Sequence, residues 1–467
     1  MTADRVVVAG GGIGGLGVAL ALARRGREVL VLERDQLPHA GSAEEAFETE
    51  RPGATQMHQT HGFLARIVVL MRAEFPDLLD ALLDAGCTTM SGTVALGEPR
   101  PGDEDLSILL VRRSTFEWVL RRAVAFEPGI EVRSGAGVTG LLDSPKAASA
   151  TPVVGGVALD DGTEITGGFV VAATGRRGDV PAWLGALGVH VPETIRPSGL
   201  VYLTRWYRTV GSVAVAPAPK AGGDLGFLKF LVVPGDGGTV SATLAIPTED
   251  NELRRSLSDP DRFDQACRSL PGPDEWFGEL DLVPVGGIRP MGGLMNRIRR
   301  FTDDDGRPSV LNFHAVGDAH TCTNPLYGRG CSLALVQGVL LAQADQAHSD
   351  RVERARAYES ACTEQVTPWW AHAVELDRSG ADPVQDDPVS RAFGDRFAAL
   401  MAASQTDPVV GRAMARLWNL LALPSALDGD PEFSARAAEI MGDPEHYPTP
   451  EVPGPTRDVL LEALASV

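Results

Sequence analysis

Paired cysteines are missing from this 467-residue sequence, which has five cysteines and no Cys-x-x-Cys motif. The five are Cys87, Cys267, Cys322, Cys331 and Cys362. Their odd number and wide spacing argue against a disulfide framework and against a zinc site. His58 and His61 could suggest a metal pair, but a third ligand is missing nearby. We therefore expect no metal, free thiols and a reducing, cytoplasmic environment.

Long apolar runs and an excess of positive charge are also lacking. No stretch is long and apolar enough to cross a bilayer, and glycines within 10–17 interrupt the N-terminal run that a signal peptide would need. Asp and Glu number 62 against 42 Lys and Arg, and the resulting net charge of −20 disfavours a nucleic-acid partner or an anionic membrane. A recognisable nucleophile elbow is absent, so hydrolase chemistry is disfavoured as well.

Glycine is abundant at the N-terminus, where it falls between a buried strand and a helix. The spacing is Gly10-x-Gly12-x-x-Gly15, and a second apolar strand, residues 28–32, ends in Glu33. Glycines at these positions permit a tight turn and a close backbone approach, the helix N-terminus can hold a pyrophosphate, and the acid can bind a ribose hydroxyl. The stretch therefore predicts a dinucleotide-binding turn in its required strand-helix context.

The rest of the chain predicts an α/β protein with a discontinuous nucleotide-binding domain. Buried strands at 169–173 and 310–316 fit a Rossmann-like sheet, and a long apolar helix follows from 330 to 346. Alternating side chains from 200 to 246 predict an inserted antiparallel sheet, with further strands at 212–216, 225–233 and 239–246. We predict three regions: a nucleotide-binding domain (1–190 and 284–346), a β-sheet substrate domain (191–283) and a helical C-terminal region (347–467).

A capping box predicts where one helix begins. Ser114 or Thr115 can cap the helix N-terminus, and Glu117 can reach back to the cap. We therefore expect these residues to satisfy the first free amides of that helix.

Three separated blocks resemble those of flavoprotein monooxygenases with the para-hydroxybenzoate-hydroxylase-like fold. They are the N-terminal fingerprint with Glu33, the run 170–176, and the run 314–319 followed by 324–330. The resemblance extends to about residue 346 and implies a Rossmann-like (GR2-type) domain that binds FAD rather than NAD. Residues 51–61, residues 181–188 and the C-terminal third are most similar to actinobacterial oxidoreductases related to polyketide and polyether epoxidases.

The resemblance implies a role for each part of the FAD site. The first glycine turn would hold the pyrophosphate, Glu33 the ribose, and Arg34 and Val138 the adenine. Arg113 and Asp318 would reach the ribityl and phosphate region, and the turn before the 330–346 helix would line the isoalloxazine ring. The implied cofactor-binding residues are Gly10, Gly12, Ile13, Gly14, Gly15, Glu33, Arg34, Gln56, Arg113, Val138, Thr174, Gly175, Gly317, Asp318, Pro325, Gly328, Arg329, Gly330 and Cys331.

Two segments are candidates for the substrate side. The family suggests a loop over the flavin with Arg51, Gln56 and His61 facing it, although a plain surface loop is the alternative. Tyr202, Thr204 and Trp206 would share one face of their strand and could form the floor of a substrate pocket. Packing of that face against a helix is the alternative for these three.

The second block departs from the family pattern. Ala172 stands where relatives commonly carry an aspartate, and Gly178-Asp179 replaces their Ser-Arg pair. Because the family associates this block with NADPH handling, we hypothesise that a separate reductase, or an already reduced flavin, supplies the electrons.

The resemblance implies a monooxygenase whose flavin C4a-hydroperoxide delivers one oxygen atom from O2 to an apolar small molecule. The substrate would be polyketide-, terpenoid- or aromatic-like, and the reaction epoxidation or hydroxylation. The flavin would carry the oxygen, so we name no catalytic side chain. The alternatives are an FAD-dependent dehydrogenase or prenyl-chain reductase, and a non-catalytic FAD-binding protein. The Trp-x-Trp-x-Ile-Pro signature of flavin halogenases is absent.

Overall fold

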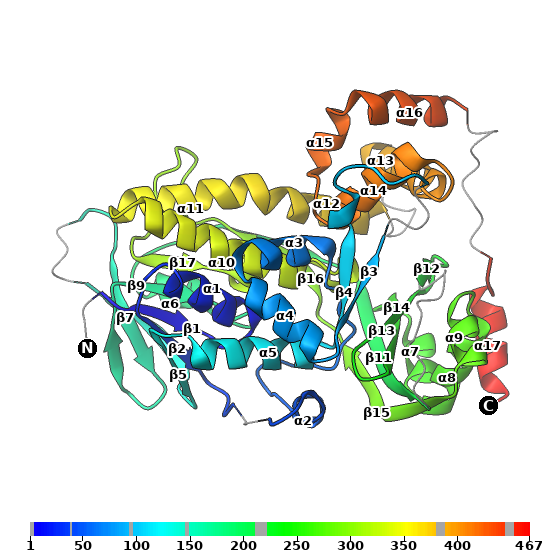
Figure 1. Ribbon diagram of the computed structural model, residues 1–467, viewed down its shortest axis with the longest axis horizontal. Coiled ribbons are helices and arrows are strands. Elements are labelled where there is room, and N and C mark those ends of the chain that lie inside the picture. The colour runs from blue at the N-terminus through cyan, green and yellow to red at the C-terminus, as the bar shows by residue number, and fades with distance from the viewer. Residues whose placement is uncertain are drawn as a thin grey trace.

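The fold combines a central parallel sheet, a second antiparallel sheet and a set of C-terminal helices (Figure 1). The computed structural model describes residues 4–37, 40–92, 97–144, 149–210, 222–379, 388–443 and 453–467. The strand predicted at 212–216 lies outside these residues.

The central sheet is parallel and has the order β17-β9-β1-β2-β5. Its strands are β1 (Val6–Ala9), β2 (Val29–Glu33), β5 (Ile130–Ser134), β9 (Phe169–Ala172) and β17 (Phe313–Ala315). Both faces of the sheet are covered, which explains why β1, β2 and β9 are continuous apolar runs. The predicted Rossmann-like sheet is confirmed.

Alternate side chains of β1 enter two different cores. Val6 and Val8 pack with the helices α1 (Ile13–Ala23), α5 (Arg113–Phe126) and α10 (Gly330–Ala347). Val7 packs on the opposite face. That face is covered by an antiparallel sheet of β6 (Val138–Asp143), β7 (Val154–Leu159) and β8 (Glu164–Thr166). The helices and this small sheet therefore enclose the central sheet from its two sides.

The second large sheet is antiparallel, as predicted, with the order β12-β13-β14-β11-β15. Its strands are β11 (Leu200–Thr209), β12 (Gly222–Asp224), β13 (Lys229–Pro234), β14 (Thr239–Pro247) and β15 (Leu282–Met291), and the helices α7 (Asn251–Leu257), α8 (Pro260–Ser269) and α9 (Pro273–Glu279) follow β14. β15 continues across residue 283, the predicted end of the β-sheet substrate domain. Leu460 and Leu464 of α17 (Arg457–Ala465) are buried in this core, so the last helix packs against the sheet domain (Figure 1).

The remaining elements connect these layers. A small sheet joins β10 (Glu193–Pro197), β16 (Met295–Arg299) and β18 (Thr321–Cys322), and β3 (Thr88–Ser91) pairs with β4 (Ser107–Leu110). The other α-helices are α2 (Ala43–Glu48), α3 (Ala65–Glu74), α4 (Pro76–Asp84), α6 (Val180–Gly185), α11 (Arg351–Gln365), α12 (Thr367–Ser379), α13 (Pro388–Ala403), α14 (Pro408–Trp418), α15 (Pro424–Asp428) and α16 (Pro431–Gly442). Short 3₁₀ helices are η1 (Asp103–Asp105), η2 (Gly317–Ala319) and η3 (Pro325–Tyr327).

The predicted capping box is wrong. Helix α5 begins at Arg113, and the residue at its N-cap is Arg112, whose side chain makes no capping bond. Thr115 donates its hydroxyl to Asp236 (2.7 Å), and Glu117 is buried among arginine side chains. Tertiary ion pairs therefore use the side chains that the local pattern had assigned to the cap.

All five cysteines are buried and free, as expected. Among the described helices, none is both long enough and apolar enough to pass through a bilayer.

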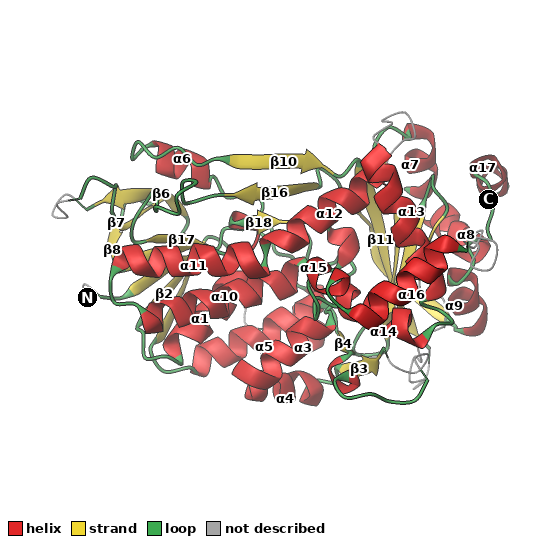
Figure 2. Ribbon diagram, turned by 90° about the horizontal axis from the view of Figure 1, so that it is seen from above, coloured by secondary structure: helices red, strands yellow, loops and turns green. Residues whose placement is uncertain are grey.

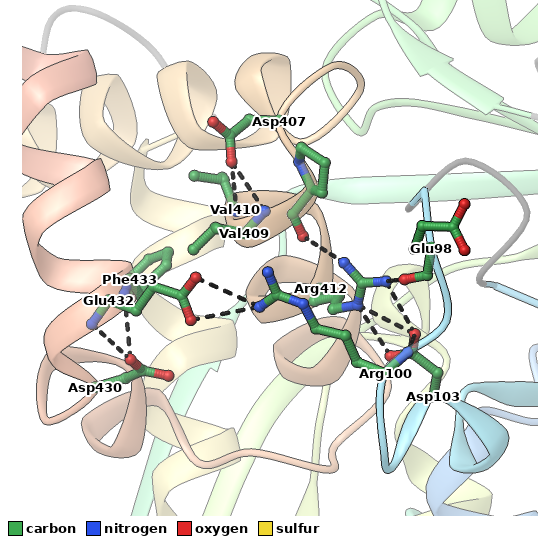
Figure 3. A network of polar contacts seen from close by, with 11 residues as sticks. Glu98, Arg100, Asp103, Asp407, Val409, Val410, Arg412, Asp430, Glu432 and Phe433 are labelled. Atoms are coloured by element: carbon green, nitrogen blue, oxygen red, sulfur yellow. Dashed lines mark hydrogen bonds and ion pairs between the residues drawn. The ribbon is translucent and has the colours of Figure 1, made fainter.

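A buried ion pair joins α14 of the C-terminal region to η1 of the nucleotide-binding part (Figure 3). Arg412 of α14 donates from Nε to both carboxylate oxygens of Asp103, at 3.1 and 3.2 Å, and both side chains are about nine-tenths buried. Arg412 also donates to the main-chain carbonyl of Glu98. Removing one partner of such a pair leaves a buried charge without its hydrogen bonds.

We expect Asp103→Asn to lower the free energy of unfolding by about 2 kcal/mol, because it removes charge-assisted hydrogen bonds to Arg412. Asp428→Asn is the matched control. Asp428 also pairs with an arginine of a C-terminal helix, at 2.8 Å, but its side chain is 63% exposed. We expect less than about 0.5 kcal/mol there. Urea unfolding of both variants checks this, and equal effects would contradict it.

Candidate functional site

A cavity of about 450 Å³ opens where β1 and β9 end. The carboxyl ends of parallel strands are the usual ligand position in an open α/β sheet. Every predicted cofactor-binding residue except Gly15 lines this cavity. The structure therefore brings together residues that the sequence spreads over more than 300 positions.

The N-terminus of α1 faces the cavity without a cap. Its N-cap residue is Gly12, with φ −85° and ψ −173°, and none of the described side chains bonds to the free first-turn amides. A Cβ added to Gly12 would meet no described atom within 4 Å. Free amides and the positive end of the helix dipole therefore point into open space, which is the geometry of an anion site.

Gly15 has a different task from the one implied by the resemblance. A Cβ at this position would lie 1.8 Å from the carbonyl oxygen of Gly10 and 3.3 Å from Cβ of Ala173. Only glycine lets α1 rest directly on the turn that follows β1. Gly15 packs the helix on the sheet and does not reach the cavity.

Glu33 lies at one end of the cavity with its carboxylate held on several sides. It accepts hydrogen bonds from the amides of Gly11 (2.7 Å) and Asp35 (3.0 Å). Arg51, predicted to face the flavin, instead forms ion pairs with Glu33 (3.2 Å) and with the buried Glu117. Arg51 still lines the cavity. It therefore orders the end of the cavity where Glu33 would bind a ribose.

His61 and Arg113 meet in the middle of the cavity wall. The Nδ1 atom of His61 lies 2.9 Å from the carbonyl of Gln59, and Nε2 lies 3.2 Å from Nη1 of Arg113. Burial and the positive charge of Arg113 lower the pKa of His61 to about 3. The ring is therefore neutral, and its Nδ1–H donates while Nε2 accepts from Arg113.

Asp318 lies in η2 and lines the cavity. Burial raises the pKa of its carboxyl group, while Arg176, Arg113 and Arg297 act to lower it. Arg297 donates to the main-chain carbonyls of Asp318 (2.9 Å) and Arg176 (3.1 Å), and so joins the end of β9 to η2. The preceding residue, Gly317, is also held in place: its main-chain amide donates a hydrogen bond to Oε1 of Gln337 (2.8 Å).

The N-terminus of α10 forms a second uncapped helix end at the cavity. Its N-cap is Arg329, and no capping bond from a described side chain is present. The Arg329 guanidinium points toward α12, where it donates to the carbonyl of Trp369 (3.0 Å). Its Nη2 atom lies 2.8 Å from Nδ1 of His372. Burial lowers the pKa of Arg329 to about 10. The Gly328 amide donates to the carbonyl of Pro325 (2.9 Å), so the amides left for the cavity are those of Gly330 and Cys331 at the start of α10.

Tyr202, Thr204 and Trp206 do share one face of β11, but that face does not floor the cavity. Thr204 donates to Oε1 of Gln59 (2.7 Å), and Trp206 donates to the carbonyl of His58 (2.8 Å). Tyr202 donates to the side chain of Asn324. The loop that carries His58 and Gln59 and the turn at Asn324 cover this face. The three side chains therefore support segments that line the cavity and do not line it themselves.

Several cavity residues were not predicted. They come from the loop of residues 51–62, from α6, from the ends of β15 and β18, from the start of β16 and from the turn before η3, namely Gln59, Thr60, Trp183, Met291, Met295, Cys322 and Thr323. The hydroxyl of Thr323 is buried and has no hydrogen-bond partner in the described part of the chain. These residues belong to no sequence motif or regular spacing, so their position at the cavity follows only from the fold.

Residue 172 lies inside the central sheet and does not line the cavity. Ala172 is fully buried within β9, between Ala9 and Ala315 of the neighbouring strands. The cavity begins one residue later, and Asp179 of the same block lines it. The missing acid at 172 therefore leaves the cavity charge unchanged, whereas Asp179 places a carboxylate at it.

The comparisons with known proteins identify the fold. Residues 8–67 match the family described as "NAD(P)-binding Rossmann-like domain". No curated protein sequence matches. Among solved structures, the chain is similar to a probable FAD-dependent monooxygenase, PqsL, from Pseudomonas aeruginosa (18% identity, 84% of this chain and 99% of that chain, TM-score 0.58). It is also similar to OxyS anhydrotetracycline hydroxylase from Streptomyces rimosus (20% identity, 91% of this chain and 76% of that chain, TM-score 0.57). A third similar structure is the flavin-dependent brominase Bmp2 (17% identity, 95% of this chain and 98% of that chain, TM-score 0.60). The chain shares the fold of these flavoproteins.

The two glycines of the turn should respond differently to substitution. We expect Gly15→Ala to lower the free energy of unfolding by at least about 2 kcal/mol, because its Cβ would overlap the Gly10 carbonyl. Gly12→Ser should change it by no more than about 0.5 kcal/mol, because serine suits an extended N-cap. Urea unfolding of the cofactor-free protein measures both, and a reversed order would contradict the packing described here.

Proposed function

We propose that this chain is an FAD-dependent monooxygenase that acts on an apolar small molecule. The observation that carries the proposal is the pair of uncapped helix N-termini, those of α1 and α10, that meet the same cavity. A dinucleotide with a negatively charged pyrophosphate and an electron-accepting ring needs donors at two separated places. The fold, shared with the flavoproteins named above, supports the same assignment.

The residues present fit FAD. Glycines 12, 175 and 330 leave open space where a Cβ would stand, and so form a cradle for a close ligand. The buried hydroxyl of Thr174, at the cavity, has no partner among the described residues. We propose that the α1 amides hold the pyrophosphate, that Glu33 holds the ribose, and that the Gly328–Cys331 turn holds the isoalloxazine ring.

Bound FAD, once reduced, would supply the activation of O2 and the transfer of one oxygen atom. The chain contributes placement and electrostatics. The free amides at the start of α10 would stabilise negative charge on the ring, and Met291, Met295 and Cys322, which line the cavity, would form an apolar wall that limits access of water. His61 is neutral and already bonded to Arg113, so we assign it a positioning role and no proton transfer.

The apolar wall favours a polyketide-, terpenoid- or aromatic-like substrate, and the reaction would be epoxidation or hydroxylation. An FAD-dependent dehydrogenase or prenyl-chain reductase would use the same cavity for hydride transfer. A non-catalytic FAD-binding protein would need only the cradle. Product mass separates these three functions.

The first test is cofactor binding. We expect the wild-type protein to bind FAD, and Gly12→Ser to weaken binding at least about tenfold without loss of stability, because its side chain would enter the pyrophosphate cradle. Titration of the cofactor-free protein with FAD, followed by fluorescence quenching, measures this. Unchanged affinity would remove the pyrophosphate assignment.

The second test is turnover under ¹⁸O₂ with chemically reduced flavin and a panel of apolar alkenes and phenols. We expect a product heavier by one ¹⁸O atom, because the apolar side chains Met291, Met295 and Cys322 at the cavity would favour an apolar substrate there. A product that differs by two hydrogens would favour the dehydrogenase or reductase. A bound flavin that never reacts with any reductant would favour the non-catalytic protein.

The electron source is tested separately. We propose that a separate reductase or a reduced flavin supplies the electrons. Asp179, which follows Arg176 and Arg177 at the cavity, adds a carboxylate that would repel the phosphates of NADPH. We expect NADPH alone to bleach the bound flavin slowly in an anaerobic stopped-flow experiment, with dithionite as the control for complete reduction. Rapid bleaching by NADPH would overturn this part of the proposal.

A further inference from the structure

Helix α12 of the C-terminal region brings a partly buried carboxylate, that of Asp377, against the turn at η3. Figure 2 shows α12 running past the ends of β16 and β18. The Oδ1 atom of Asp377 accepts hydrogen bonds from Nδ2 of Asn324 (2.8 Å) and from the hydroxyl of Tyr327 (2.6 Å). Its Oδ2 atom accepts from Nδ2 of Asn296 (2.6 Å). Asn324 and Tyr327 flank Pro325, which lines the cavity.

Asn324 is the centre of this network and is fully buried. Its main-chain amide donates to Oδ1 of Asn296 at 2.7 Å. Its own Oδ1 accepts from the hydroxyl of Tyr202 and from the amide of Leu326. With the bond to Asp377, the residue before Pro325 is fixed from four directions.

The partners determine which way both amides point. Asn296 uses its oxygen for the Asn324 amide, so its NH2 group must face Asp377. Asn324 uses its oxygen for Tyr202 and Leu326, so its NH2 group must face Asp377 as well. A site that receives three donors needs a group that only accepts, and an ionised carboxylate is such a group. An asparagine at 377 would turn an NH2 group toward at least one donor.

We infer that Asp377 is a positioning residue for the turn from Thr323 to Gly330, acting through Asn296, Asn324 and Tyr327. The inference rests on the proposed function, because this turn is the part of the cavity assigned to the isoalloxazine ring. It gives the C-terminal region a part in the site, since Asp377 does not itself line the cavity. Burial raises the pKa of Asp377, and the hydrogen bonds from Tyr327, Asn324 and Asn296 act in the opposite direction.

The test compares FAD binding by the full-length wild-type protein and Asp377→Asn. We expect the dissociation constant for FAD to rise at least about tenfold, because a buried hydrogen-bond network to a charge is broken at the turn. We also expect the vibrational structure of the visible flavin band to change, since the surroundings of the ring would be less fixed. Wild-type values for both would overturn the inference.

Asp103→Asn is the matched control. It makes the same chemical change at another aspartate that anchors the C-terminal helices, but Asp103 is buried against Arg412 and does not line the cavity. We expect it to lower the melting temperature and to leave the FAD dissociation constant and spectrum unchanged. If it weakened FAD binding as much as Asp377→Asn does, general loosening would explain both and the inference would fail.

Tyr327→Phe provides a milder variant that removes a single hydroxyl donor. We expect a several-fold rise in the dissociation constant and a spectral change of the same kind as in Asp377→Asn. If Asp377→Asn does not fold, this variant decides, and a wild-type result for it would overturn the inference. Absence of FAD binding by the wild-type protein would overturn the proposed function and this inference together. An FAD dissociation constant that is the same in the wild-type protein and in both variants would overturn the inference alone.

Discussion

The position of the cavity depends on one steric contact, between the start of α1 and the turn after β1. Gly15 lies so close to the Gly10 carbonyl that a side chain cannot be placed between them, and Gly10 itself has φ +114° beside the carbonyl of Ala173. These contacts bring the ends of β1 and β9 to the same point as the first turn of α1. The free amides of that turn therefore emerge between two strand ends, where a ligand can reach them.

This part of the molecule could be predicted from the sequence because its causes are local. A strand that is buried on both faces must be continuously apolar, and a helix that begins on that strand must begin with glycines. Short-range sterics of this kind leave a spacing that can be read without the fold. The turn before α10 was assigned from the family resemblance instead, and its residues line the same cavity, whereas Gly15 serves the packing of α1.

The misassigned residues are polar side chains whose partners are distant in sequence. Alternation predicts that Tyr202, Thr204 and Trp206 share a face, but it carries no information about what covers that face. In the structure Gln59 and His58 cover it, from about 145 positions away. Glu117 matched a capping box, yet the buried arginines around it offer stronger charge-assisted bonds than a helix amide. Asp377 and α17 could not be assigned for the same reason.

The charge of the whole chain and the charge of the cavity oppose each other. A net charge of −20 would repel an anionic ligand at long range, but ions in solution screen such repulsion beyond about 8 Å at physiological salt. Inside the cavity the nearest groups decide. Two helix N-termini and Arg113 are positive there, and the acid Glu33 is paired with Arg51. An anionic dinucleotide would therefore be held by short-range donors, whose placement depends on the backbone contacts at Gly10 and on the support that Asn324 receives from Asp377.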